Sequence, residues 1–263
     1  MPAPDALPPL FDAHLDPTGL TDADLEALRY FGLASAVLVV DGQPSATARG
    51  LIQAFDRLVQ VQLPRFRRAG IRAFAALGVA PNDLPRRGLA AVLSELPSRF
   101  RGLAVAVGET GLAGGGPAEE EAFLRQVTLA KGLGLPLVVH TPRQDRALHT
   151  RRVLSLLRSS GLPPARVLVN HVEPKTVRTV LECGHFAGLT VHPDELPAEA
   201  AVALVRRHGA ERLVLNTGHG GGEILALARV AARLAAAGLS ARVIARVTHD
   251  NAANLYRVAD EGR

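Results

Sequence analysis

In LPLVVHTP, residues 135–142, a short apolar run ends at His140, a possible metal ligand. Three other runs end in the same way: LFDAHLD at 10–16, LAVAVGET at 103–110 and RVLVNHV at 166–172. Runs that are apolar throughout are typical of strands buried on both faces, as parallel sheets require. In a barrel of alternating strands and helices, the carboxyl ends of all strands meet at one mouth. The four runs therefore predict a parallel barrel whose possible ligands gather at one end.

Similar apolar runs recur along the whole chain, with helical stretches between them. The predicted strands lie at about 10–12, 35–40, 71–79, 103–109, 135–140, 166–171, 187–191 and 212–216. This alternation indicates the α/β class, and a chain of 263 residues suits a (β/α)8 TIM barrel, which typically needs about 250. We therefore expect one TIM-barrel domain over 1–263, with residues 1–9 as a short N-terminal leader, rather than an open doubly wound sheet.

Two helical stretches contain signals that set their bounds. Pro64 is expected to interrupt or restart the helix predicted within 46–70, because proline has no main-chain N–H to donate. A further short helix is predicted at 250–258, with Asp250 and Asn251 at its start.

Composition narrows the class of protein. Hydrophobic residues make up 48% of the chain and charged residues 21%, as in globular proteins, and the single cysteine, Cys183, excludes a disulfide framework. No apolar run approaches the ~20 residues that span a bilayer, and the N-terminus does not resemble a signal peptide. We therefore expect a cytoplasmic protein with no membrane partner. The net charge of +5 comes from scattered arginines, which favours a solvated basic surface over a nucleic-acid-binding stripe.

The first strand carries three polar residues in alternation: Asp12, His14 and Asp16. Alternate residues of a strand share one face, so all three are expected to point into the barrel, where unpaired charge is costly. Such a triplet requires a cation or a buried hydrogen-bond network. For Asp16, which precedes Pro17, a plain helix-capping role is the alternative.

Three more candidates end later strands: Glu109, His140 and His171. Alone, Glu109 could hydrogen-bond a loop, and either histidine could be a satisfied core residue. Together at strand ends they favour a metal site with one or two divalent ions. Zinc is the expected ion, and magnesium and manganese are the alternatives.

Other residues are predicted at the same mouth. His192 and His219 follow the last two strands and are candidates for proton transfer. Arg143 is a candidate for anion binding, with a solvent-facing loop arginine as the alternative. Glycine-rich turns follow at 111–116 and 218–222. Barrels often bind phosphate after the last strands, so Gly220 and Gly221 are candidate anion-binding positions, with a flexible loop that binds no ligand as the alternative.

At this point the chain resembles a known family. The motifs DAHLD, GETGL, PLVVHTPR, VNHVEP and NAANLYRV are similar to those of the TatD-related metal-dependent hydrolases of the amidohydrolase superfamily, in the branch whose fifth strand ends His-Thr-Pro-Arg. The resemblance implies a (β/α)8 barrel and hydrolysis of ester or phosphoester bonds, on DNA ends in some relatives. It also implies that Glu109 bridges metals, that His140 and His171 are ligands, and that a last-strand Asp binds metal and assists the attacking water.

The sequence departs from that pattern at two positions. Asp16 stands where the family has a second first-strand histidine, which shifts the site towards oxygen ligands. Gly218, in LVLNTGHGGG at 213–222, stands where the family has the last-strand Asp. Glycine neither binds metal nor accepts a proton, and the adjacent His219 is the candidate replacement.

Three hypotheses about function follow. The first is a metal-dependent hydrolase of a small-molecule ester or phosphoester, and the second is a catalytically degenerate barrel with a binding or accessory role. The third is a TatD-like nuclease, which the absence of Trp and the presence of only two Tyr disfavour, since base stacking needs aromatic side chains. The oligomeric state is left open.

Overall fold

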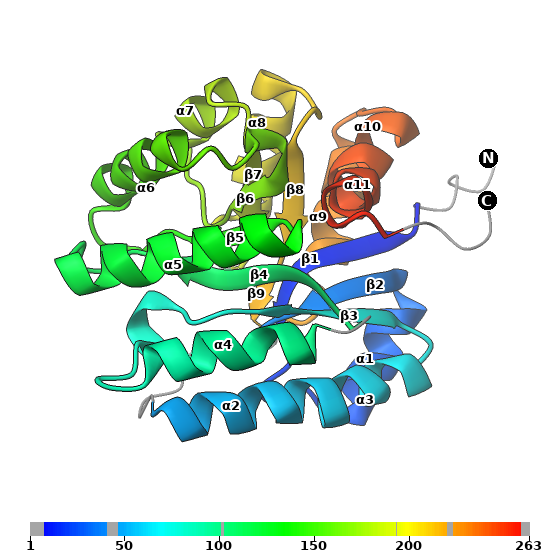
Figure 1. Ribbon diagram of the computed structural model, residues 1–263. Helices are drawn as coiled ribbons and strands as arrows, with labels where there is room; N and C mark the ends of the chain where they lie inside the picture. Colours follow the sequence, from blue (N-terminus) through cyan, green and yellow to red (C-terminus); the bar gives the residue numbers. More distant parts are fainter. Residues whose placement is uncertain (1–7, 41–46, 101–102, 193, 220–222, 259–263) are drawn as a thin grey trace.

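The computed structural model describes residues 8–40, 47–100, 103–192, 194–219 and 223–258. Strands and helices alternate along these residues, and the helices lie around the outside of the strands (Figure 1). The strands are β1 (Leu10–Asp16), β2 (Leu33–Leu38), β3 (Arg72–Leu77), β4 (Ala104–Gly111), β5 (Leu137–His140), β6 (Val167–Val169), β7 (Phe186–Thr190), β8 (Leu213–Asn216) and β9 (Gly218–His219). The α-helices are α1 (Asp22–Tyr30), α2 (Ala48–Arg57), α3 (Leu63–Arg68), α4 (Leu89–Arg99), α5 (Pro117–Leu133), α6 (Arg146–Ser160), α7 (Val177–Glu182), α8 (Ala198–His208), α9 (Ala226–Ala236), α10 (Ala241–Ala245) and α11 (Asn251–Tyr256).

The sheet is parallel, and β1 to β8 lie side by side in chain order. β9 continues the last strand after Thr217 and pairs with β1, where Leu15 lies opposite Gly218 and Asp16 opposite His219. Because β8 pairs with β7 and β9 with β1, the last strand closes the sheet. The architecture is the expected single-domain (β/α)8 TIM barrel.

The core has two parts, one inside the barrel and one between the strands and the helices. The inner part contains Phe11 and Ala13 of β1 together with small and aliphatic residues of the other strands, and Tyr256 of α11 packs against it. The Tyr256 hydroxyl donates to the Ala13 carbonyl oxygen at 2.7 Å. The interior is therefore filled below the mouth, which leaves the carboxyl ends of the strands as the accessible end.

Strand β1 is irregular, and this corrects the expectation that Asp12, His14 and Asp16 share one face. Its register with β2 shifts between Asp12 and Leu15, and such an irregularity changes which face successive residues occupy. Asp12 lies between Phe11 and Ala13, which face the barrel interior, so it belongs to the outer layer. There it lies beside Leu28 of α1 and Leu227 of α9. His14 lies at the mouth instead.

The helices follow local signals. α5 begins at Pro117, has Glu119 and Glu120 in its first turn, and ends at Gly134 in a left-handed conformation, an arrangement that suits the helix dipole and the terminal turn. Between α2 and α3, the turn Leu58–Gln62 is π-helical and Pro64 lies in the first turn of α3. Pro64 therefore follows an interruption, as predicted.

The C-terminal helical segment is longer than the sequence indicated. It starts after Ser240, whose hydroxyl accepts the Val243 N–H, and it runs through α10, the π-helical turn Arg246–Asp250 and α11. The short helix predicted at 250–258 is present as α11, which starts at Asn251, but it continues from the π-helical turn and the Asp250 side chain does not cap it. Asn251 instead donates from Nδ2 to the carbonyl oxygens of Ala210 and Leu213, both at 2.7 Å, and so ties the start of β8 to this segment.

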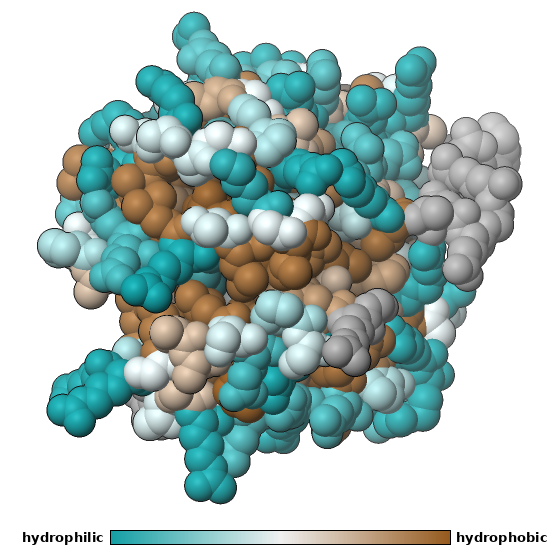
Figure 2. Space-filling view, in the orientation of Figure 1, coloured by the Kyte–Doolittle hydropathy of each residue, from teal (hydrophilic) through white to brown (hydrophobic). Residues whose placement is uncertain are grey.

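On the face shown in Figure 2, hydrophobic surface lies in the grooves between helices, and hydrophilic side chains project around it. None of the helices that the structure describes combines the length and the hydropathy needed to cross a bilayer.

Candidate metal centre

The centre of the mouth is Glu109, a buried residue near the end of β4. Three imidazole nitrogens surround one of its carboxylate oxygens. The distances from Glu109 Oε1 are 3.0 Å to His140 Nδ1, 3.4 Å to His171 Nε2 and 3.6 Å to His14 Nε2. His14, Glu109 and His171 each offer a ligand atom, and these atoms lie within 4.8 Å of one another. The structure thus brings together four of the six residues that the sequence predicted as ligands.

Local backbone features place these side chains. Gly108 precedes Glu109, and a Cβ atom there would lie 2.6 Å from the Val138 carbonyl oxygen, so glycine allows β4 to pack directly on β5. His171 follows β6 in a left-handed conformation, with φ of +58°, which is uncommon for a residue with a side chain. The Thr141 hydroxyl donates to the Asn170 carbonyl oxygen at 2.6 Å and fixes this turn.

The charges of the cluster are set by burial and by the neighbours. Burial lowers the pKa of His14 to about 4, so its ring is neutral at pH 7. Burial would raise the pKa of Glu109, but the neighbouring imidazoles of His140, His14 and His171 hold it well below its usual value. The site therefore presents an ionised carboxylate to imidazole rings.

Two buried polar atoms of the cluster, Glu109 Oε2 and His14 Nδ1, have no hydrogen-bond partner among the described residues. An unpaired buried carboxylate oxygen is costly, and such groups in a folded protein require an explanation. Carboxylate and imidazole together are the ligand types that Zn²⁺ and related divalent ions bind. The cluster therefore fits a divalent cation.

The two acids of β1 lie apart from this group of four. The Asp12 carboxylate accepts the N–H of His14 at 3.1 Å and the N–H of Thr217 at 3.2 Å, and it also accepts the Thr217 hydroxyl. Burial raises the pKa of Asp12 to about 6, although these hydrogen bonds lower it. Asp12 thus joins β1 to the last strand.

Asp16 Oδ1 accepts the Thr18 hydroxyl at 2.7 Å and the Thr18 N–H at 3.0 Å. It therefore holds the turn at Pro17 and Thr18 and does not cap a helix, because the N-cap of α1 is Thr21. Its function as a metal ligand stays a prediction.

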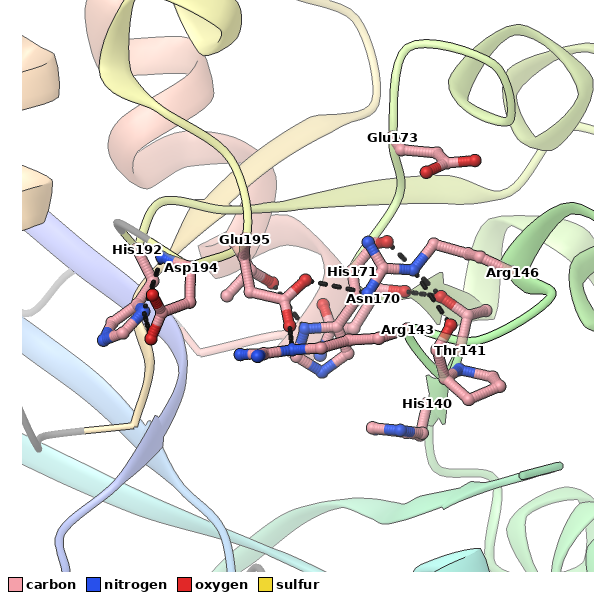
Figure 3. A network of polar contacts seen from close by, with 12 residues as sticks. His140, Thr141, Arg143, Arg146, Asn170, His171, Glu173, His192, Asp194 and Glu195 are labelled. Atoms are coloured by element: carbon pink, nitrogen blue, oxygen red, sulfur yellow. Dashed lines mark hydrogen bonds and ion pairs between the residues drawn. The ribbon is translucent and has the colours of Figure 1, made fainter. Parts of the chain in front are cut away.

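A cavity of about 430 Å³ opens beside the cluster, with walls that include His140, His171, His192 and Arg143. Figure 3 shows Arg143 and Arg146 reaching Glu195 at this mouth. Arg143 Nε donates to Glu195 Oε1 at 2.6 Å, and Arg146 Nη2 donates to Oε2 at 2.8 Å. Burial would raise the pKa of Glu195, but His171 and the two guanidinium groups lower it. Sequence analysis missed Glu195, although an acid soon after the seventh strand was an available signal.

The remaining predicted residues are placed as follows. His192 is buried at the cavity wall, and its Nδ1 accepts the Asp194 N–H at 3.2 Å. The main chain of His219 lies in β9, opposite Asp16, and its side chain is outside the described part of the structure. Gly220 and Gly221 also lie outside the described residues.

The other glycine-rich turn, 111–116, already holds an anionic group. Glu119 accepts the main-chain N–H groups of Ala113, Gly114 and Gly115 at 2.8, 3.0 and 2.9 Å. These donors are therefore occupied by the protein's own carboxylate.

A parallel barrel with a carboxylate and three histidines at its mouth defines a (β/α)8 protein with a candidate metal-binding centre at the strand ends. Residues 12–257 match the family model described as TatD related DNase. The chain belongs to this family, the TatD-related metal-dependent hydrolases.

Individual relatives agree with this assignment. An uncharacterized metal-dependent hydrolase of Methanocaldococcus jannaschii is 25% identical over 254 residues, which are 95% of this chain and 100% of that protein. An uncharacterized metal-dependent hydrolase TatD of Mycobacterium tuberculosis is 30% identical over 195 residues, 67% of this chain and 66% of that protein. The crystal structure of a TatD-like protein from Archaeoglobus fulgidus superposes with a TM-score of 0.82 at 27% identity, covering 94% of this chain and 100% of that one.

Proposed function

We propose that this chain hydrolyses an ester or phosphoester bond in a small molecule that carries an anionic group. Glu109, His14, His140 and His171 would hold one or two divalent ions, with zinc as the first candidate. Asp16 is a further candidate ligand. The observation that carries the proposal is the meeting of three imidazoles at one buried carboxylate oxygen whose partner oxygen has no hydrogen bond among the described residues.

A bound divalent ion polarises a carbonyl or phosphoryl group and lowers the pKa of a water molecule. The chain's own residues would bind and orient the substrate next to it. Glu195 holds Arg143 through Nε, so the outer nitrogens of this guanidinium can donate to an anionic group in the cavity. This arrangement supports Arg143 as the anion-binding residue.

His192 is the proposed proton donor to the leaving group. Its Nδ1 accepts a hydrogen bond, so the neutral ring carries its proton on Nε2. His219 stays a second candidate, since its main chain lies beside Asp16 at the same mouth.

Metal analysis and a substrate panel test the proposal. The protein is stripped with a chelator, reloaded with Zn²⁺, Mn²⁺ or Mg²⁺, and its metal content is measured before it is given carboxylesters, phosphomonoesters and phosphodiesters. His14→Ala and Glu109→Gln should lose both bound metal and hydrolysis. His208→Ala, which removes a histidine of α8, is the matched control and should retain both. Wild-type protein that binds no metal after loading would exclude the hydrolase function.

Arg143 has a separate test. Loss of one hydrogen bond to a charged group costs about 1.5–3 kcal/mol, so Arg143→Gln should raise KM for an anionic ester roughly 10- to 100-fold. KM for a neutral ester of similar size should change little. Equal effects on both esters would exclude the assigned role.

A barrel that binds a ligand without catalysis is the second candidate, and Gly218 favours it. Position 218 has φ of +83°, and a Cβ atom there would lie 2.7 Å from Thr190 Cγ2. The space for a last-strand acid is therefore filled. Metal binding at full stoichiometry without turnover on any ester of the panel would support this candidate.

The family description also keeps a nuclease function open. The net charge of +5 is consistent with it, and the scarcity of aromatic residues is not. Failure to bind DNA at low ionic strength would rule out the nuclease.

A further inference from the structure

A chain of buried polar side chains lies behind His171, on the side away from Glu109. His171 Nδ1 is 3.0 Å from the Thr190 hydroxyl, which donates to Asn216 Oδ1 at 2.9 Å. Asn216 Nδ2 then donates to Asn170 Oδ1 at 3.1 Å. Thr190 is 1% exposed and both asparagines are fully buried, so the side chains cannot exchange these partners for bulk water.

Two glycines, one in β7 and one in β9, leave the space that this chain of side chains occupies. A Cβ atom at Gly188 would lie 2.0 Å from Asn170 Oδ1, and one at Gly218 would lie 2.7 Å from Thr190 Cγ2. Both distances are too short for real contacts. The row of polar side chains can form only because residues 188 and 218 have no side chains. Steric exclusion by Thr190 thus favours glycine at position 218.

The donors and acceptors of this chain determine where the His171 proton sits. A threonine hydroxyl has one hydrogen, and here it is donated to Asn216. The Thr190 oxygen must therefore accept from His171, which places the ring proton on Nδ1. The lone pair of Nε2 then faces Glu109 Oε1 at 3.4 Å. Two lone pairs facing each other favour a cation between them.

We propose that Thr190 is a positioning residue that fixes His171 in its Nδ1–H form for metal binding, and that Thr190, together with the φ of +83° at Gly218, requires glycine at that position because Thr190 occupies the space beside it. The proposal rests on the proposed function in that His171 is a metal ligand. It explains the loss of the family's last-strand acid by a contact within this chain.

The tautomer of His171 in metal-free protein tests the first part. Nitrogen-15 NMR of wild-type protein should show the Nδ1–H form, and His171→Gln identifies the signal. Thr190→Val keeps the shape but cannot accept the proton, so the Nδ1–H form should no longer dominate. Thr190→Ser keeps the hydroxyl and should retain it. An Nε2–H form in the wild-type protein would overturn the proposal.

Zinc affinity tests the consequence for the metal. Loss of a residue that orients a ligand typically costs 10- to 100-fold in metal affinity, so the Kd for Zn²⁺ should rise by that factor in Thr190→Val and stay near wild type in Thr190→Ser. An unchanged Kd in Thr190→Val would refute the positioning role while leaving the proposed function intact. If the wild type binds no zinc, the proposed function fails, and the NMR result still decides whether Thr190 sets the tautomer.

The steric part has its own variants. Gly218→Ala should disturb the His171 signal and weaken zinc binding, since its Cβ meets the Thr190 methyl group. Thr190→Ser removes that methyl group but keeps the hydroxyl. In the double variant Thr190→Ser/Gly218→Ala, the tautomer and the zinc Kd should therefore return part of the way to the wild type, because only the strain of alanine at a φ of +83° remains. A double variant as impaired as Gly218→Ala alone would show that the contact with Thr190 is not the cause.

Discussion

Replacing Asp12 with asparagine is expected to change how the free energy of unfolding depends on pH. Asp12 is buried between β1 and the last strand, and its pKa rises from the usual 3.8 to about 6 in the folded protein. Between these two values the folded protein binds more protons than the unfolded chain. Stability contributed by the protonated carboxyl is therefore present below about pH 4 and is lost as pH rises through 6.

The magnitude follows from the two pKa values. They differ by about two pH units, and each corresponds to ~1.4 kcal/mol, so the titration of Asp12 removes roughly 3 kcal/mol between pH 4 and pH 7. Asparagine has nearly the same shape and no charge. The difference in unfolding free energy between Asp12→Asn and wild type should therefore shift in favour of the variant by this amount as pH rises.

Urea unfolding followed by circular dichroism at pH values from 4 to 8 measures this difference, since the chain has no Trp for fluorescence. Thr217→Val is the companion variant. It removes the hydroxyl that lowers the Asp12 pKa, so the loss of stability should extend to higher pH. Parallel stability curves for wild type and Asp12→Asn across this range would refute the reasoning.

Three further results are expected. His14→Gln should lower the pH at which half of the protein is unfolded in acid. The pKa of His14 is about 4 in the folded protein and 6.5 in the unfolded chain, so wild type loses up to ~3 kcal/mol of stability as pH falls through this window. An unchanged midpoint would argue against a neutral buried ring. Asn251→Ala removes two buried hydrogen bonds and should lower the free energy of unfolding by about 2–3 kcal/mol, which corresponds to a drop in Tm of roughly 5–10 °C. A Tm within a degree of wild type would show that Asn251 does not hold the start of β8. Glu119→Ala should speed hydrogen exchange at the amides of 113–115, and equal protection in both proteins would show that the carboxylate does not hold the turn.

The barrel and the central ligands could be predicted because their signals are local. Each apolar run ends at its candidate ligand. The parallel pairing of the strands then brings Glu109, His140 and His171 to one mouth, independently of the loop conformations. His14 joins them, although the irregularity in β1 that places it there gave no signal in the sequence.

Other features depend on partners distant in the chain. Asp12 was misplaced because the register of β1 shifts between it and Leu15, and its partner Thr217 lies 205 residues away. Thr190 was missed because nothing near it in sequence shows that it contacts His171. The place of Glu195 soon after the seventh strand was a signal, but its partner Arg143 lies 52 residues away. In the sequence, Gly218 was interpreted as the loss of an acidic residue. The structure shows that a side chain at this position would collide with Thr190 and would be strained by the φ of +83°.

The sequence by itself determined the barrel, the order of its strands and the residues at their carboxyl ends, because hydrophobic periodicity acts over a few neighbouring residues. Only the tertiary structure decided which of those side chains face the mouth, which nitrogen of His171 carries the proton, and whether position 218 has room for a side chain. These properties depend on contacts between strands at distances of 2–4 Å, where a shift of one residue or the addition of one carbon atom reverses the outcome.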